Sequence, residues 1–403
     1  MNPLKIYLLD LTYDTITLST EAFPLNVGYI ASYTKERFGS NVEITLFKYI
    51  HDIEHELKKS PPDILGVSNY SWNHRIGREM SSIFSKLNPD GVVVWGGPNF
   101  PVDLPSQERF FRENPNVDIY VSVEGEIGFT NVVEKALEAK SHKEIRTNVL
   151  SKPIDGCITR SANGKLQYTI PEIRIKKLDE IPSPYLTGLM DKFFDGKLCP
   201  TIQTNRGCPF HCTFCTDGRD SVNQVNSFSL ERVSAEIDYI ANHVTWNTAQ
   251  LLISDLNFGM FPKDSEICDY IDASKKKYGY PKLVHTTTGK NKKERIISNI
   301  EKLGGTIKMD MAVQSTTPEV LKNIRRDNIS TEHLVAIGPA IKKTGLTLSS
   351  DIIAGLPGET FESTLQSIKD IIHADVDEVL IWTLMMLDGS ELNVPKEREK
   401  WNI

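Results

Sequence analysis

The stretch Arg206-Gly207-Cys208-Pro209-Phe210-His211-Cys212-Thr213-Phe214-Cys215 carries three closely spaced cysteines. The spacing CxxxCxxC can hold three irons of a cubic 4Fe-4S cluster and leaves the fourth iron without a protein ligand. A cluster that only carries electrons normally has four cysteine ligands, so this pattern predicts that a small molecule completes the coordination. The alternative is a zinc site, which needs a fourth protein ligand. His211 is adjacent to Cys212, and Cys199 lies before the predicted strand that leads into the three cysteines. Neither residue is therefore well placed to be a fourth zinc ligand, and the iron-sulfur cluster is favoured.

The overall composition is that of a globular protein. The chain has 403 residues, of which 39% are apolar and 25% charged, enough for two or three ordinary domains. The first residues lack the features of a signal peptide, and no apolar run approaches the roughly 20 residues of a membrane span. A net charge of -7 argues against a nucleic-acid partner. We therefore expect a cytoplasmic protein, in which Cys157, Cys199 and Cys268 are ordinary thiols rather than disulfides.

The first part of the chain alternates short apolar runs with amphipathic segments, as βαβ units around a parallel sheet do. One helix is expected to bury Phe129, Val132, Val133, Ala136 and Leu137 on a single face. Strands are predicted at Lys5–Leu9, Val42–Phe47, Ile64–Ser68, Val92–Trp95 and Val117–Val121. This pattern predicts a Rossmann-like, doubly wound parallel sheet over residues 1–142.

A second α/β series follows after residues 143–198, which are expected to form a short hairpin around Asn163-Gly164 and then a connector. One helix is expected to open at Thr317-Pro318-Glu319. Strands are predicted at Thr201–Gln203, Leu251–Ser254, Leu283–Thr287, Ile307–Val313, Leu346–Ile353 and Val379–Leu384. Six such units predict a partial (β/α)6 TIM-like barrel over residues 199–392, with its active face at the strands' carboxyl ends. The cysteine stretch follows the first of these strands.

Small residues follow two strands of the first predicted sheet, at the edge where α/β proteins bind ligands. Gly96-Gly97-Pro98-Asn99 comes after the fourth strand, and Glu124-Gly125-Glu126 comes after the fifth. Glycine allows the backbone to approach a bulky ligand closely, although each glycine alone could simply shape a turn. The two loops together predict a binding site.

These motifs resemble those of radical S-adenosylmethionine enzymes, in the subgroup whose N-terminal domain binds cobalamin. Besides the cysteines, the resemblance includes Asp255-Leu256-Asn257-Phe258, Gln314-Ser315 and the run from Asp351 to Thr360. It covers nearly the whole chain. By this resemblance, Cys208, Cys212 and Cys215 bind the cluster, and S-adenosylmethionine chelates the open iron. An electron from the reduced cluster then cleaves S-adenosylmethionine to methionine and a 5'-deoxyadenosyl radical.

The resemblance also assigns contacts with S-adenosylmethionine. Asp255 would lie near its methionine end, Gln314 with Ser315 near its ribose, and Arg325 or Arg326 near its carboxylate. An Asp at a strand end often caps a helix, however, and paired arginines are usually solvated. The full set of these residues is Phe214, Asp255, Gln314, Ser315, Arg325, Gly355 and Gly358.

For cobalamin, the resemblance implies binding without a protein histidine on cobalt. The DxHxxG motif that supplies this histidine in many cobalamin proteins is absent, because Asp10 is followed by Leu11 and Thr12; His74 is the nearby histidine to consider. Trp72 or Tyr70 could cover the lower face of the corrin ring, and core packing is an equal alternative. The assigned contacts are Asn26, Gly28, Ser68, Trp72, Gly96, Gly97, Glu124, Gly125 and Glu126.

The resemblance implies a cobalamin-dependent methyltransferase that acts on an unactivated carbon of an unknown small-molecule or peptide substrate, with a flavodoxin- or ferredoxin-type reductant. Similar enzymes cyclise or rearrange substrates without methyl transfer. From another class, a non-catalytic iron-sulfur or cobalamin redox sensor or adaptor would not need the barrel motifs. Relatives continue into a C-terminal domain where this chain has the charged tail 393–403. We expect either a truncated piece or a barrel mouth closed by a partner or by the substrate.

Overall fold

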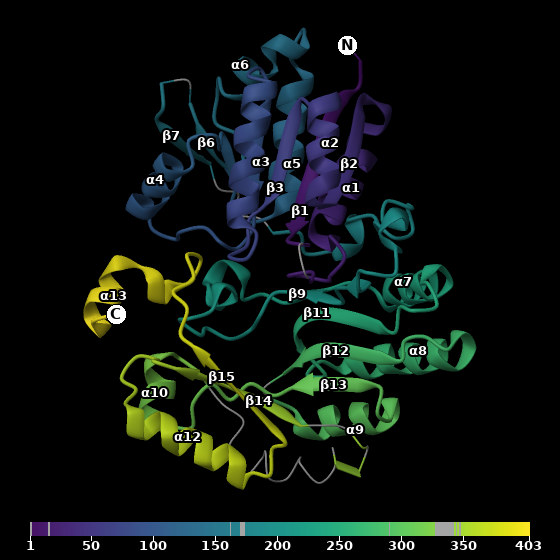
Figure 1. Cartoon of the computed structure of the whole chain (residues 1–403), viewed down its shortest axis with the longest axis vertical. Coiled ribbons are helices and arrows are strands. Elements are labelled where there is room, and N and C mark those ends of the chain that lie inside the picture. Colours follow the sequence, from purple (N-terminus) through teal and green to yellow (C-terminus); the bar gives the residue numbers. More distant parts are fainter. Residues whose placement is uncertain are drawn as a thin grey trace. The chain divides into compact units, whose positions relative to one another are not determined.

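The computed structural model describes residues 2–14, 17–161, 163–169, 174–289, 291–326, 342–343, 345 and 348–403 (Figure 1). The chain divides into two compact units, Met1–Phe193 and Phe194–Ile403. Among the described residues, none of the helices has both the length and the apolar character that a membrane span requires.

The first unit is built on a seven-stranded sheet in the order β2-β1-β3-β4-β5-β6-β7. The five predicted strands are present and pair in parallel. The hairpin predicted around Asn163-Gly164 pairs antiparallel with β5 and so adds two strands to this sheet. The strands are β1 (Leu4–Thr12), β2 (Val42–Tyr49), β3 (Ile64–Ser68), β4 (Val92–Gly96), β5 (Ile119–Val121), β6 (Cys157–Arg160) and β7 (Leu166–Thr169).

Helices cover both faces of the first sheet because its strands bury side chains on both sides. Tyr7 and Leu9 of β1 join a core with Ile53 and Ile76 from the helices of one face, whereas Gly66 of β3 lies against Phe129 on the other. The helices are α1 (Leu25–Phe38), α2 (Ile50–Lys59), α3 (His74–Leu87), α4 (Leu104–Glu113), α5 (Gly125–Leu137) and α6 (Ile145–Val149). The face predicted on α5 is buried at Phe129, Val132, Val133 and Ala136 and half-buried at Leu137.

The second unit contains a six-stranded parallel sheet in the order β15-β14-β13-β12-β11-β8, and a two-stranded pair of β9 with β10. All six predicted strands are present, although the predicted start of the fifth, Leu346 and Thr347, lies outside the described residues. The strands are β8 (Thr201–Ile202), β9 (Asn205–Arg206), β10 (Asn226–Ser227), β11 (Gln250–Phe258), β12 (Leu283–Thr288), β13 (Ile307–Asp310), β14 (Ser349–Ala354) and β15 (Glu378–Thr383). The α/β class and the parallel pairing of the predicted strands are therefore confirmed.

Helices follow the strands of this second sheet. They are α7 (Leu230–His243), α8 (Pro262–Tyr278), α9 (Lys293–Leu303), α10 (Pro318–Asn323), α12 (Phe361–His373) and α13 (Pro395–Trp401). α10 begins at Pro318 after Thr317, as predicted. The strand predicted from Ile307 to Val313 ends at Asp310, and the chain returns to β14 only at Gln314, through an isolated bridge to Ile352.

The two faces of the second sheet differ in character. Register pairs Leu251 with Val284 and then Val284 with Ile307, so these buried apolar residues share one face. On the opposite face Asp351 is half-buried and Trp382 is exposed. The first face thus carries core residues on β11, β12 and β13, although Ile381 on the edge strand β15 is exposed on that same face.

Candidate functional site

The cysteine stretch forms a loop between β9 and β10, which pair antiparallel. Within it, Cys208 N donates to Val222 O (3.1 Å) and Cys215 N donates to Cys212 O (3.1 Å). Gly207 has φ 108°, and a Cβ atom there would overlap the carbonyl oxygen of Gln224. Glycine before the first cysteine is therefore required by the path of the loop.

The second half of the loop is anchored to other elements of the unit. Thr213 N donates to Ile324 O (3.1 Å), and Thr213 O accepts from Leu392 N (2.9 Å). Phe214 packs against the apolar cluster of Val320, Ile324 and Leu356. The predicted role of Phe214 as a cofactor contact thus acquires a packing explanation, since its ring fixes Cys215 against the end of α10.

Two buried side chains direct donors toward cysteine sulfurs. Asn257 Nδ2 donates to Cys208 Sγ (3.4 Å), and Arg326 Nη1 lies 3.9 Å from Cys212 Sγ. Burial lowers the pKa of Arg326, and the three cysteines oppose this by favouring its charged form. The sulfurs therefore lie near enough to one another to share one electrostatic environment.

The thiol of Cys215 would stay protonated in the free protein. Burial raises its pKa to about 12, and Asp217 and the other two cysteines add to this effect. Deprotonation would need a bound cation that replaces the proton. Such a cysteine binds metal as a thiolate, and without metal its protonated thiol is a poor nucleophile.

The donor set fits an iron-sulfur cluster better than a single zinc ion. Within the described ranges, no three His, Cys, Asp or Glu side chains are close enough to share one metal ion. His211 Nδ1 lies 3.2 Å from Asp220 Oδ1, so this histidine has a contact with another side chain. A 4Fe-4S cluster spreads its irons over several positions, so its cysteines need not converge on one ion. Hydrogen bonds to sulfur are a known means of tuning such clusters.

Asp255 is fully engaged in holding the strand that precedes the cysteines. Its carboxylate accepts from Thr204 N (2.8 Å), Asn205 N (3.3 Å) and Asn205 Nδ2 (2.7 Å), and also from the Thr204 hydroxyl. Burial raises its pKa to about 7, although these hydrogen bonds act in the opposite direction. The structure thus gives Asp255 a positioning role behind the loop.

Gln314 has the feature expected of a residue that awaits a ligand. Its Oε1 atom is buried and has no hydrogen-bond partner among the described residues. Its backbone is held in a left-handed conformation with φ 70° by bonds to Asp351 O (2.8 Å) and from Ile353 N (2.9 Å). The neighbouring Ser315 is fully buried, with its hydroxyl 3.4 Å from that of Ser367. Of this predicted pair, Gln314 is the better candidate for a ligand contact.

The predicted glycines after β14 form a loop closed by Glu359. Glu359 Oε2 accepts from Gly355 N (2.8 Å) and Leu356 N (3.2 Å). Its other oxygen is buried and unpaired within the described part of the chain. Gly358 has φ 81°, and a Cβ atom there would lie 2.6 Å from Asn323 Nδ2. Gly358 therefore serves the contact of this loop with α10.

The two adjacent arginines have different surroundings. Arg325 is exposed, has φ 51° and forms an ion pair with Glu391. Arg326 is buried beside Cys212. The structure thus brings Arg326, rather than the predicted Arg325, to the cysteine loop, because the positive φ of Arg325 turns the two side chains apart.

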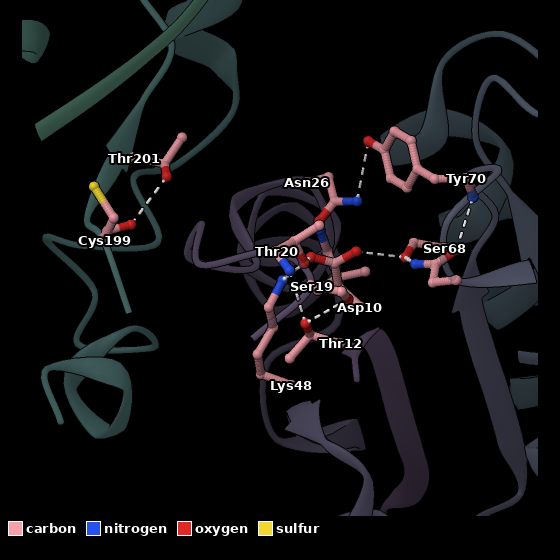
Figure 2. A network of polar contacts seen from close by, with 12 residues as sticks. Asp10, Thr12, Ser19, Thr20, Asn26, Lys48, Ser68, Tyr70, Cys199 and Thr201 are labelled. Atoms are coloured by element: carbon pink, nitrogen blue, oxygen red, sulfur yellow. Dashed lines mark hydrogen bonds and ion pairs between the residues drawn. The ribbon is translucent and has the colours of Figure 1, made fainter. Parts of the chain in front are cut away.

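In the first unit, Ser68 belongs to a polar network at the carboxyl end of β1 (Figure 2). Ser68 Oγ donates to Asp10 Oδ1 (2.6 Å), and Lys48 Nζ lies 3.1 Å from Asp10 Oδ2. Lys48 and Asp10 are both buried, so each charge requires the other. Thr12, which stands where DxHxxG proteins have histidine, accepts a hydrogen bond from Thr20 N (3.0 Å).

The aromatic residues after β3 face outward. Tyr70 and Trp72 stack with ring centroids 4.5 Å apart, and Trp72 is 48% exposed. Asn26 Nδ2 donates to Tyr70 Oη (3.3 Å), which joins the start of α1 to this stack (Figure 2). Core packing, the alternative interpretation for Trp72, is therefore wrong. An exposed stacked indole offers a flat apolar surface to a ligand.

Two predicted glycines have packing reasons of their own. Gly97 has φ 127°, and a Cβ atom there would lie 2.7 Å from Asn69 O. A Cβ atom on Gly28 would overlap the side chain of Met190. Gly96, in contrast, would accept a Cβ atom at ordinary contact distance from Val121. The close approach required at Gly97 and Gly28 is thus between segments of the protein.

The acidic loop after β5 is internally satisfied. Glu124 forms a buried ion pair with Arg174 (2.9 Å), and Glu126 is buried in the first turn of α5. Gly125 lies against Ile30, with 3.1 Å between its Cβ position and that side chain. These residues shape the edge of the sheet, and charged contacts with a ligand would have to compete with Arg174.

His74, the histidine considered as a cobalt ligand, has a packed environment. Its Nδ1 lies 2.9 Å from Asn69 Oδ1, and its ring contacts Trp95 and Phe110 edge-on. This ring is held by its neighbours.

Asn257 and Lys48 are the site residues that sequence reasoning missed as individuals. Asn257 lies two residues after Asp255, so alternation along β11 places both toward the cysteine loop, and this signal was available. Lys48 sits within an apolar strand, and only its proximity to Asp10 reveals its partner.

Comparisons with known proteins agree with this geometry. The radical SAM superfamily model matches residues 202–371. The cobalamin-dependent radical SAM methyltransferase TokK of Streptomyces tokunonensis is 29% identical over 85% of this chain and 50% of its own length. The 2-(S-pantetheinyl)-carbapenam-3-carboxylate methyltransferase of Streptantibioticus cattleyicolor is 27% identical over 93% of this chain and 55% of its own. This chain spans about half the length of these curated relatives.

A solved structure shares the fold over almost the whole chain. TsrM from Kitasatospora setae, a radical S-adenosylmethionine methyltransferase with cobalamin and a 4Fe-4S cluster bound, superposes with a TM-score of 0.74. The match covers 98% of this chain and 74% of TsrM at 13% identity. Residues 202–371 are therefore similar in sequence to the radical SAM superfamily, and most of the chain is similar to cobalamin-dependent radical SAM methyltransferases.

Proposed function

We propose that this chain is the cofactor-binding part of a radical SAM enzyme that methylates an unactivated carbon with the help of cobalamin. The observation that carries the proposal is the cysteine loop, where Asn257 and Arg326 direct donors to two of the three sulfurs. This loop lies within the region that matches the radical SAM superfamily. The names of the two curated relatives support methyl transfer over cyclisation or rearrangement.

In this proposal, the first unit is a Rossmann-like, doubly wound domain for cobalamin and the second is a partial barrel. Helices on both faces of the first sheet and the six parallel strands of the second support this division. The hairpin of β6 and β7 is assigned to the cobalamin domain, because β6 pairs with β5. The first domain then extends beyond the boundary at residue 142 predicted from the sequence.

When bound, the cluster and S-adenosylmethionine would supply hydrogen-atom abstraction, and cobalamin would supply the methyl group. Cys208, Cys212 and Cys215 hold the cluster, and Asn257 orients the first sulfur. Arg326 brings a buried positive charge beside Cys212, which favours the thiolate form of the cysteines. The protein's task is to orient these groups and exclude water.

Two unpaired oxygens would provide contacts for S-adenosylmethionine. Gln314 Oε1 and Glu359 Oε1 are both buried and unpaired within the described residues, and a buried acceptor without a donor destabilises the protein. The hydroxyl and amino groups of S-adenosylmethionine could satisfy both atoms. Asp255 supports these contacts indirectly by fixing Thr204 and Asn205 at the start of the loop.

For cobalamin, the first unit offers an aromatic surface in place of a histidine ligand. The stacked Tyr70 and Trp72 would cover the lower face of the corrin and exclude water from it. The polar network of Asp10, Ser68 and Lys48 holds the carboxyl ends of β1 and β3 together. Gly96, which is free of close backbone contacts, is the glycine that could face a ligand.

The test is anaerobic incubation of the chain, loaded with cluster and cobalamin, with S-adenosylmethionine and a reductant. In this proposal the enzyme is cytoplasmic, and its reductant is of the flavodoxin or ferredoxin type. The proposal predicts both 5'-deoxyadenosine and S-adenosylhomocysteine. Production of 5'-deoxyadenosine alone would favour cyclisation or rearrangement. Neither product from a fully loaded cluster would favour a redox sensor or adaptor and would refute the proposal.

A further inference from the structure

Helix α12 carries a row of large apolar side chains outside the face that it buries (Figure 1). The buried face includes Ile371 and Ser367, and Ser367 Oγ accepts from Thr316 N (3.0 Å). The additional row, here named the α12 stripe, consists of Phe361, Leu365, Ile368 and Ile372. Three of its four members are exposed, Phe361 by 78% and Ile372 by 58%. Solvent thus reaches most of this stripe.

The spacing of the α12 stripe is that of a coiled-coil seam. Its members are separated by four, three and four positions, which is the alternation of the d and a sites in a heptad repeat. Single exposed apolar residues are ordinary on a protein surface, but a row at this spacing is the pattern by which one helix packs against another. Packing within the unit does not require the stripe, because Ile371 and Ser367 already provide the buried face. The stripe therefore indicates that the partner is another helix.

Two charges of opposite sign flank the stripe. Glu362 follows Phe361 and Lys369 follows Ile368, so both occupy e positions of the heptad, where charged pairs between helices form. They are two turns apart, about 10 Å along the helix. Within the part of the chain that the structure describes, neither side chain has a hydrogen bond or an ion pair. Both charges are thus available to a partner helix.

The order of the stripe and its charges fits a second copy of α12 in the antiparallel direction. When Leu365 of one copy packs on Ile368 of the other, Phe361 of each copy lies level with Ile372 of the other. The same arrangement brings Glu362 beside Lys369 of the other copy, twice in each pair of helices. Parallel packing would instead bring every residue level with its own copy. Charge complementarity therefore selects both the partner and its direction.

We propose that α12 is the docking surface for a second copy of this chain, with the two α12 stripes packed antiparallel. Each copy contributes one helix of 13 residues, so the interface is small. Small interfaces bind weakly, and we expect a dissociation constant on the order of 10 µM. The inference goes beyond the proposed function and does not depend on it, because only residues of α12 take part.

The test is sedimentation velocity of the full chain at concentrations from about 1 to about 200 µM, a range that spans the expected constant. The wild type should pass from one chain to two over this range. Glu362→Lys and Lys369→Glu should each weaken the dimer about tenfold, because both charged pairs then become like-charged. Glu399→Lys, a matched reversal at an exposed position of α13, should leave the dimer unchanged.

An equimolar mixture of the Glu362→Lys and Lys369→Glu chains tests the direction of packing. In a dimer of one chain of each kind, both pairs again join opposite charges, so the mixture should dimerise about as tightly as the wild type. A mixture as weak as its separate components would overturn the antiparallel arrangement. A wild-type chain that stays monomeric throughout, or a dimer that neither reversal weakens, would overturn the docking surface itself. The wild-type series decides this even if a variant does not fold.

Discussion

The candidate sites of the two units differ in how their polar side chains are paired. In the first unit, the polar residues near the strand ends already bond to one another, as Asp10 does with Ser68 and Lys48, and Glu124 with Arg174. In the second unit, Gln314 and Glu359 each keep a buried oxygen without a partner among the described residues. A ligand of the first unit would thus meet side chains that already have hydrogen-bond partners. A ligand of the second unit would supply the partners that Gln314 and Glu359 lack.

This difference separates two kinds of sequence signal. Cysteines and buried amides indicate chemistry, because their atoms need a partner that the protein does not supply. Glycines indicate only that something approaches closely, and at Gly28 and Gly97 that neighbour is the protein itself. The following experiments test the contrast.

The largest effect is expected at the cysteines. Alanine at Cys208, Cys212 or Cys215 should abolish the 4Fe-4S cluster, measured as bound iron and sulfide after anaerobic reconstitution, because each sulfur holds one iron. Cys199→Ala serves as the control and should retain the cluster. A full cluster in any of the three variants would contradict the assignment.

Gly97→Ala should destabilise the first unit strongly. The new methyl group would collide with Asn69 O in a left-handed backbone, so we expect the free energy of unfolding to fall by about 3 kcal/mol. Gly164→Ala, with φ 80° and open space around it, should cost about 1 kcal/mol. Urea unfolding measures both. Similar losses would show that Gly97 has no special packing role.

Asp255 should make stability depend on pH. Its pKa is about 7 when folded and near 4 when unfolded, so the folded chain binds the extra proton between these values. The free energy of unfolding should therefore fall as pH rises from about 4 to 7, by on the order of 4 kcal/mol. Asp264, with a pKa raised by burial to about 6, acts in the same direction.

Asp255→Asn isolates this contribution. The difference in unfolding free energy between wild type and variant should change across the same pH range and remain constant above it. A difference that does not vary with pH would contradict the raised pKa.

Asn257→Leu should lower the midpoint potential of the cluster. A hydrogen bond to Cys208 Sγ stabilises the more negative reduced cluster, and leucine removes this donor. Redox titration followed by electron paramagnetic resonance measures the shift. Asn242→Leu, at an exposed position of α7, is the matched control. An unchanged potential would show that the contact does not affect the cluster.

The smallest effect on stability is expected at Trp72. Because its ring is half exposed, Trp72→Ala should change the free energy of unfolding by no more than about 0.5 kcal/mol. It should nevertheless alter the visible spectrum of bound cobalamin, while Trp246→Ala in the second unit should not. An unaltered spectrum would remove Trp72 from the corrin site.

Most strands were predictable because short apolar runs mark them, and their alternation with helices follows the βαβ pattern. The end of β13 was not predictable. The chain rejoins β14 at Gln314, whose left-handed backbone is not indicated by residue propensity. The hairpin of β6 and β7 was recognised by its turn, but its pairing with β5 depends on long-range contacts.

The candidate site was predictable where chemistry depends on residue type and spacing, as in the cysteines. It was not predictable which of the adjacent Arg325 and Arg326 faces the cysteines, because residue type is the same and the left-handed backbone of Arg325 is not encoded by any local pattern. The exposure of Trp72 likewise depends on the path of a loop after β3, which the hydrophobic pattern does not encode.

The most direct test of the cysteine loop is Mössbauer spectroscopy of the 57Fe-loaded chain with and without S-adenosylmethionine. If the loop leaves one iron open, one of the four iron sites should change its signal when S-adenosylmethionine binds, and the other three should not. Identical spectra with and without S-adenosylmethionine would contradict the open iron on which the account depends.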